Sequence, residues 1–106
     1  MSINKNYAVF GLGRYGRAVA KELVDNGAEV IVVDSDSKTV EEFSGDFPIC
    51  KCADVTEREV IKQLGISNVD VAVIAIAGQF EASVMATMLC KEAGVGQVIV
   101  KCSSEM

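Results

Sequence analysis

The chain contains no histidine, and this removes the commonest metal ligand and the commonest general base. Its four cysteines are Cys50, Cys52, Cys90 and Cys102. Cys50 and Cys52 form a Cys-x-Cys pair in a predicted strand, but no second pair follows, so their spacing does not predict a zinc site. We interpret the cysteines as small buried hydrophobic residues of a protein in a reducing cytoplasm.

The chain also lacks an excess of positive charge and a long apolar run. Ten lysines and arginines stand against 15 aspartates and glutamates, and no basic run is present, which argues against nucleic-acid binding. The longest apolar run, Val69 to Ala77, is interrupted by Asp70 and is far too short to span a bilayer. Because Met1 to Asn6 are mostly polar, we expect no signal peptide and a cytoplasmic protein without direct membrane insertion.

Catalytic constellations are missing as well. No serine or cysteine is paired with a base that would activate it, and no carboxylate pair has a recognisable acid and base layout. We therefore predict that the protein is not an enzyme.

The chain does contain a regular alternation of apolar runs and helix-like stretches. The apolar runs predict five strands, at about Tyr7–Gly11, Glu29–Asp34, Pro48–Cys52, Val71–Ala77 and Gln97–Cys102. The stretches between them predict four helices, at about Arg14–Asn26, Ser37–Ser44, Thr56–Leu64 and Phe80–Ala93. The third of these helices begins with a Thr-x-x-Glu pattern that predicts a capping box at Thr56.

Right-handed crossovers between such strands predict a single α/β domain over residues 1–106. Its fold would be Rossmann-like, a doubly wound parallel sheet with strand order 3-2-1-4-5. The fourth strand is nearly all apolar, as expected of a strand that is covered on both faces. A complete Rossmann sheet has a sixth strand, so we expect the chain to be a fragment of a longer protein.

The turn after the first strand carries a Gly-x-Gly-x-x-Gly fingerprint at Gly11, Gly13 and Gly16. The first glycine allows a tight turn, the second lets a phosphate approach the backbone, and the third lets the helix lie close to the strand. Asp34 follows at the end of the second strand, at the distance typical of the acid that binds a ribose. This arrangement predicts an adenine nucleotide (ATP, ADP, NAD or NADH) with its phosphates at the helix N-terminus.

In such sheets the ligand lies across the carboxyl ends of the strands. The predicted binding residues are Gly11, Leu12, Gly13, Arg14, Tyr15, Gly16, Asp34, Ser35, Asp36, Ala53, Asp54, Val55, Ala77, Gly78 and Lys101.

Four of these side chains have specific expected roles. Asp34 would accept hydrogen bonds from the ribose hydroxyls and repel a 2′-phosphate, which disfavours NADP. Arg14 would pair with the phosphates and favour ATP or ADP over NAD alone. Asp36 contacts the ribose side or caps the next helix, and Asp54 bonds the adenine amino group, caps a helix, or does both. Arg17, further into the helix, is expected to be solvated.

Several of these segments together resemble the N-terminal lobe of the RCK domain family, also called KTN or TrkA-N. Gly11 to Gly16 is similar to the family's Gly-Leu-Gly-Arg-aromatic-Gly, and Val33-Asp34 to its strand-2 acid. Ala53 to Thr56 resembles its Gly-Asp-Ala-Thr box, with Ala53 and Val55 as departures. The stretch from Ala75 to Ser83 and the Val100-Lys101 pair at the end of the fifth strand are also similar, and the resemblance runs from Tyr7 to about Ser103.

The resemblance implies a nucleotide-binding regulatory domain that gates a potassium channel or transporter through ligand-dependent conformational change. It implies homodimers or higher rings, docked to a membrane subunit at the inner face of the membrane. It also implies that Arg14 distinguishes a γ-phosphate and that Asp34 holds the ribose. Two alternatives stay open, the NAD-binding half of a truncated dehydrogenase and a redox-sensor module for NADH and NAD.

Overall fold

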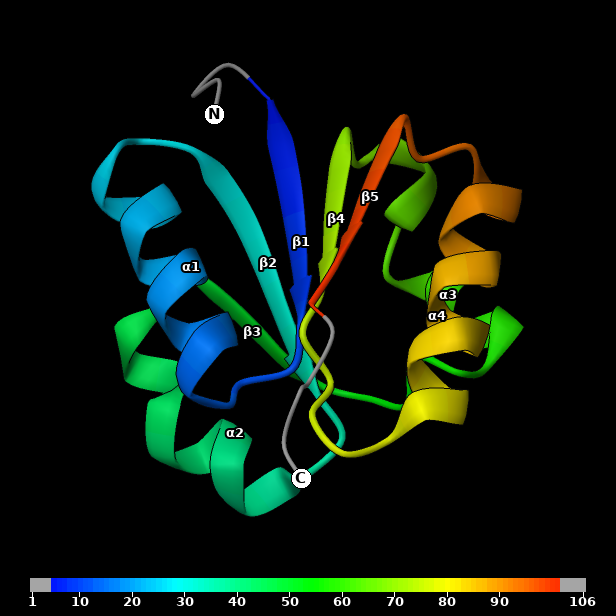
Figure 1. The fold of residues 1–106 in the computed structure, drawn as a ribbon. Helices are drawn as coiled ribbons and strands as arrows, with labels where there is room; N and C mark the ends of the chain where they lie inside the picture. Colours follow the sequence, from blue (N-terminus) through cyan, green and yellow to red (C-terminus); the bar gives the residue numbers. More distant parts are fainter. Residues whose placement is uncertain (1–4, 102–106) are drawn as a thin grey trace.

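The computed structural model of the chain describes residues 5–101 and contains one five-stranded parallel sheet. The strands are β1 (Asn6–Phe10), β2 (Glu29–Asp34), β3 (Ile49–Cys52), β4 (Val71–Ile74) and β5 (Gln97–Val100). Their order is β3-β2-β1-β4-β5, and every neighbouring pair is parallel. This confirms the predicted fold class and places all the strand carboxyl ends at one end of the sheet, the lower end in Figure 1.

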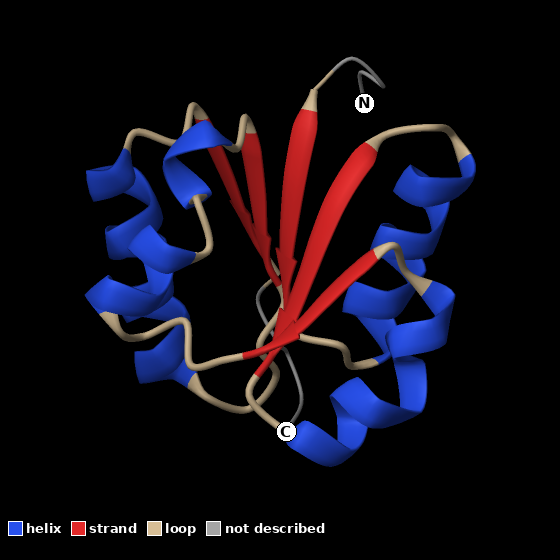
Figure 2. Cartoon of the chain, turned by 180° about the vertical axis from the view of Figure 1, so that it is seen from behind, coloured by secondary structure: helices blue, strands red, loops and turns tan. Residues whose placement is uncertain are grey.

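Helices cover both faces of the sheet (Figures 1 and 2). The helices α1 (Arg14–Asp25) and α2 (Ser37–Phe43) lie on one face, and α3 (Arg58–Gln63) and α4 (Phe80–Ala93) lie on the other. Two short 3₁₀ turns, Ser44–Asp46 and Ile66–Asn68, complete the connections.

The period-two alternation of the strands produces two cores, one on each face. In β1, Tyr7 and Val9 belong to the core that includes residues of α1, and Ala8 and Phe10 belong to the core that includes residues of α3 and α4. All four residues of β4 are buried, as predicted for a strand covered on both faces.

The turn at Gly11 ends the central strands earlier than predicted. The N–H of Ala75 still donates to the carbonyl of Phe10, at 2.7 Å. Beyond that bond Gly11 adopts a φ of 107° and takes the chain away from β4, so β4 ends at Ile74 instead of Ala77.

The predicted capping box at Thr56 is wrong. Helix α3 begins at Arg58, and its N-cap residue Glu57 makes no side-chain cap. The backbone N–H and the hydroxyl of Thr56 both donate to Asp54 Oδ1 instead, at 2.9 Å and 2.6 Å. Thr56 therefore turns toward Asp54, and α3 begins two residues after it, at Arg58.

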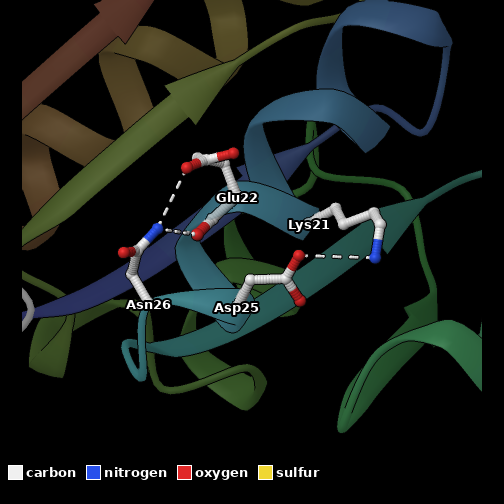
Figure 3. Close-up of polar contacts among 4 residues, drawn as sticks. All are labelled: Lys21, Glu22, Asp25 and Asn26. Atoms are coloured by element: carbon white, nitrogen blue, oxygen red, sulfur yellow. Dashed lines mark hydrogen bonds and ion pairs between the residues drawn. The ribbon is translucent and has the colours of Figure 1, made fainter.

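Helix α1 has polar side-chain contacts around its C-terminal end (Figure 3). The side-chain amide of Asn26 donates to the carbonyl oxygen of Glu22 at 2.7 Å and to its carboxylate at 3.1 Å. Lys21 and Asp25 form an exposed ion pair at 3.4 Å. Gly27, with a φ of 86°, then turns the chain toward β2.

Candidate functional site

Two of the three fingerprint glycines, Gly11 and Gly16, allow β1, the following turn and α1 to lie in close contact. A Cβ on Gly11 would collide with the carbonyl oxygen of Ala75, the residue after β4, and a Cβ on Gly16 would collide with the carbonyl oxygen of Gly11. A Cβ on Gly13 would meet nothing within 4 Å. Gly11 and Gly16 are thus required by packing, and Gly13 leaves open space where a ligand can approach the backbone.

The N-terminus of α1 presents a positive electrostatic potential to the open space beside Gly13. Its N-cap is Gly13, which makes no side-chain cap, and the first turn contains no acidic residue. The first backbone bond of the helix runs from the N–H of Arg17 to the carbonyl of Gly13. The N–H groups before Arg17 therefore point out of the helix end, where the macrodipole favours an anion.

Asp34 ties the end of β2 to the glycine turn. Its Oδ2 accepts from the N–H of Leu12 at 2.7 Å, and its Oδ1 accepts from the N–H of Asp36 at 2.8 Å. Each carboxylate oxygen accepts one such bond and keeps capacity for another donor, such as a ribose hydroxyl.

Arg17 is half-buried and has two contacts within the protein, whereas the sequence predicted a solvated side chain. Its Nη1 donates to the carbonyl oxygen of Leu12 at 3.0 Å, and its guanidinium carbon lies 4.2 Å from the centre of the Phe43 ring. Sequence reasoning missed this contact because it joins residues on two different helices.

Two further carboxylates have structural partners. Asp36 is the N-cap of α2 and accepts from the N–H of Lys38 at 3.0 Å, which confirms its capping alternative and leaves ribose contact untested. Asp54 does not cap α3 and instead accepts from Thr56. These bonds from Thr56 lower the pKa of Asp54 below its ordinary value of 3.8.

A cleft of about 1400 Å³ opens at the carboxyl ends of the strands. Of the predicted binding residues, the cleft is lined by Gly11, Leu12, Gly13, Asp34, Ser35, Asp36, Asp54 and Ala77. The turn, the β2 acid and the end of β3 thus meet in one place, as the sequence analysis expected. Arg17 is the only basic residue of this lining within residues 5–101.

The other predicted binding residues lie around the cleft. Arg14 and Tyr15 are exposed at the start of α1, and Gly16 is buried beneath the turn. Ala53 is half-buried, and the side chain of Val55 is part of the core.

Gly78 and Lys101 border a neighbouring groove of about 710 Å³, beside α4 and the end of β5. The ammonium of Lys101 lies 5.4 Å from the centre of the Tyr15 ring, so it is held near the start of α1.

Residues 7–106 match the family model of the TrkA-N domain. The chain belongs to the TrkA-N domain family. It is 42% identical over 98 residues to Ktr system potassium uptake protein A of Vibrio alginolyticus, covering 92% of this chain and 44% of that protein. It is 35% identical over 103 residues to Ktr system potassium uptake protein C of Bacillus subtilis, covering 97% and 47%. This TrkA-N domain thus spans a little under half the length of these relatives.

Solved structures support the fold. The NAD(P)-binding domain of an exopolyphosphatase-related protein from Archaeoglobus fulgidus superposes with a TM-score of 0.81 at 22% identity, covering 94% of this chain and 74% of that one. The TrkA-N domain of the inner membrane protein ybaL from Escherichia coli gives a TM-score of 0.66 at 14% identity, covering 91% and 87%.

The cysteines of this TrkA-N domain are only partly as predicted. Cys90 is fully buried, and burial raises the pKa of its thiol to about 11. Burial, and then Asp34 and Cys52, raise the pKa of Cys50. Cys52 is exposed near the end of the edge strand β3, so its predicted burial is wrong, and Cys102 lies outside the described residues.

Residues 5–101 contain neither a candidate metal site nor a candidate membrane-spanning helix. No group of three or more cysteines, aspartates or glutamates is arranged to hold a metal ion. None of the helices there combines the length and apolar character that crossing a bilayer requires.

Proposed function

We propose that this TrkA-N domain is a regulatory module that binds an adenine nucleotide and controls potassium transport through a membrane partner. One observation carries the proposal: Asp34 is hydrogen-bonded to the glycine turn, inside a cleft at the uncapped N-terminus of α1. Phosphates and a ribose are the groups that such a combination is suited to bind.

The ligand we propose is ATP, ADP, NAD or NADH. Its phosphates would lie against Gly13, where the backbone is open, and its ribose hydroxyls would donate to Asp34. A 2′-phosphate would meet the carboxylates of Asp34 and Asp36, so NADP should bind less well. The adenine would lie toward Asp54, and Ser35 and Ala77 also line the cleft.

Arg14 is the residue we expect to distinguish ligands by charge. It is exposed at the first position of α1, beside the helix end where phosphates would lie. A flexible guanidinium there can reach a terminal phosphate even though it does not line the empty cleft. Its contribution should therefore depend on how much phosphate charge the ligand carries.

The proposed mechanism is physical, with no chemical step. A ligand shifts an equilibrium between two arrangements only by its difference in affinity for them. One charge-assisted contact is worth roughly 1.5–3 kcal/mol, which shifts a two-state ratio about ten-fold or more. Nucleotides that engage Arg14 differently would favour different arrangements of the domains.

The partner and the assembly are proposed from the relatives and from the surface. The relatives are components of potassium uptake systems by name, so we propose a membrane potassium channel or transporter subunit as the partner, at the inner face of the membrane. Exposed apolar surfaces are common at contacts between subunits, and α4 and β5 carry one that could join copies into homodimers or rings, formed by Phe80, Val84, Met88 and Val100.

A ligand panel tests the nucleotide proposal. ATP, ADP, NAD, NADH and NADP are each titrated into the domain by calorimetry, with thermal shift as a second measurement, because a bound ligand raises apparent stability. We expect the first four to bind and NADP to bind least. Arg14→Ala should weaken ATP by about ten-fold and NAD less, whereas Lys21→Ala, on the exposed face of the same helix, should change neither.

Three outcomes of the ligand panel would contradict parts of the proposed function. Equal losses for ATP and NAD in Arg14→Ala would remove the discriminating role of Arg14. Binding of NADH and NAD without ATP or ADP would favour a redox sensor. No response to any ligand at millimolar concentration would contradict nucleotide binding itself.

A further inference from the structure

Both polar backbone groups of Leu12 are held by side chains of opposite charge. Its N–H donates to Asp34 Oδ2 at 2.7 Å, and its carbonyl oxygen accepts from Arg17 Nη1 at 3.0 Å. Leu12 is only 1% exposed and lies in the middle of the glycine turn. A turn residue cannot satisfy these groups through a sheet or a helix, so the two side chains take over that task.

The Arg17 side chain is itself fixed in place. Its guanidinium stacks on the ring of Phe43, so it joins the start of α1 to the end of α2 while it holds Leu12. A planar, pre-organised donor of this kind loses little freedom when it forms its hydrogen bond.

We propose that Arg17 is a positioning residue for nucleotide binding, which holds the glycine turn in its binding conformation from the side opposite Asp34. The inference rests on the proposed function, because it assigns Arg17 a part in that same site. Arg17 acts here through Leu12, and Gly13, the next residue, is where the backbone is open to phosphate.

This role makes a different prediction from a direct phosphate contact. A residue that orders the turn contributes equally to every ligand whose phosphates lie on the turn. Loss of Arg17 should therefore weaken ATP and NAD by the same factor, unlike loss of Arg14, which should weaken ATP more.

The test compares Arg17→Met, Arg17→Lys and Lys21→Met. Methionine keeps an apolar stem over Phe43 without a donor, and lysine keeps a charged donor. Lys21→Met makes the same exchange of charge for thioether on the exposed face of α1. Calorimetry gives the affinities for ATP and NAD, and hydrogen exchange of the ligand-free domain gives the protection of residues 11–16.

For Arg17→Met we expect about five-fold weaker binding of both ligands, the effect of one hydrogen bond, and faster exchange across the turn. Arg17→Lys should recover part of both, and Lys21→Met should match the wild type. Unchanged exchange in Arg17→Met, a loss for ATP alone, or no recovery with lysine would each overturn the positioning role.

Failure of the proposed function gives a separate result. In that case the wild type binds no nucleotide, whatever Arg17 does to the exchange of the turn. A wild type that binds normally, with Arg17→Met binding equally well, contradicts the positioning role alone.

Discussion

At the scale of single residues, the carboxylates of the site carry negative charge and also accept hydrogen bonds that order the nearby backbone. Asp34 accepts two backbone N–H groups, and Asp36 caps α2. Asp54 accepts the N–H and the hydroxyl of Thr56. Carboxylates that are already ordered in this way need no further ordering when a ligand donates to them, so they can bind it at lower entropic cost.

The Thr56 bonds give a pH prediction for Asp54. Because they lower the pKa of Asp54 below 3.8 in the folded state, their stabilisation is complete at pH above 3.8 and is lost as the pH falls through the folded pKa. Thr56→Val should raise the pKa of Asp54 toward 3.8. It should also reduce the free energy of unfolding at neutral pH by only about 0.5 kcal/mol, since the carboxylate is exposed to solvent.

Two measurements check this prediction. Titration of the Asp54 carboxyl carbon by NMR follows its pKa, and denaturant unfolding at neutral and acidic pH follows the stability. The stability lost in Thr56→Val should shrink as the pH falls below 3.8. Thr87→Val is the control, because the hydroxyl of Thr87 donates to the carbonyl oxygen of Ser83, a group that does not titrate. A loss that does not depend on pH would contradict the assignment.

At the scale of elements, the packing of α1 on β1 depends on Gly16. A methyl group there would overlap the carbonyl oxygen of Gly11, a backbone atom that cannot rotate away. Gly16→Ala should therefore push α1 outward and destabilise the fold by about 1–3 kcal/mol, as overpacking generally does. Denaturant unfolding measures this, with Gly45→Ala as control, since a Cβ on Gly45 meets nothing within 4 Å. Equal stability of the two variants would contradict this packing argument.

The same elements show how far sequence reasoning extends. Two local patterns predict the strand, the turn and the helix. One is the apolar run from Tyr7 to Phe10, whose side chains alternate between the two cores, and the other is the spacing of the glycines. The strand order follows from short right-handed crossovers.

Contacts that depend on tertiary packing could not be predicted from the sequence. Arg17 meets Phe43 only because the fold brings the start of α1 close to the end of α2. Thr56 had two possible partners, the N-terminus of α3 and Asp54, and no local pattern ranks them. Arg14 as a phosphate ligand stays a prediction, because an exposed flexible side chain takes its final position from the ligand.

At the scale of the whole molecule, the sheet is covered on both faces but not at its edges. Within residues 5–101, β3 and β5 are the edge strands. Beside β5, Phe80, Val84 and Met88 recur every fourth residue along α4, and Phe80 is 81% exposed. Together with Val100 they form one apolar surface that lines the groove bordered by Lys101. A surface of this kind is typical of a contact between proteins.

If this surface joins two copies of the domain, a charge placed in it should separate them. Met88→Glu puts a carboxylate where the partner's apolar side chains would remove it from water, at a cost of several kcal/mol unless it finds a partner. We expect the wild type to dimerise with rising concentration in analytical ultracentrifugation and Met88→Glu to stay monomeric. Its melting temperature should equal that of the wild type at concentrations where the wild type is also monomeric, because Met88 is largely exposed in the monomer. Lys91→Gln alters the net charge by the same amount on an exposed position of the same helix, so it should dimerise like the wild type. Equal dimerisation of all three proteins would place the contact elsewhere, and a monomeric wild type at all concentrations would contradict self-association through this surface.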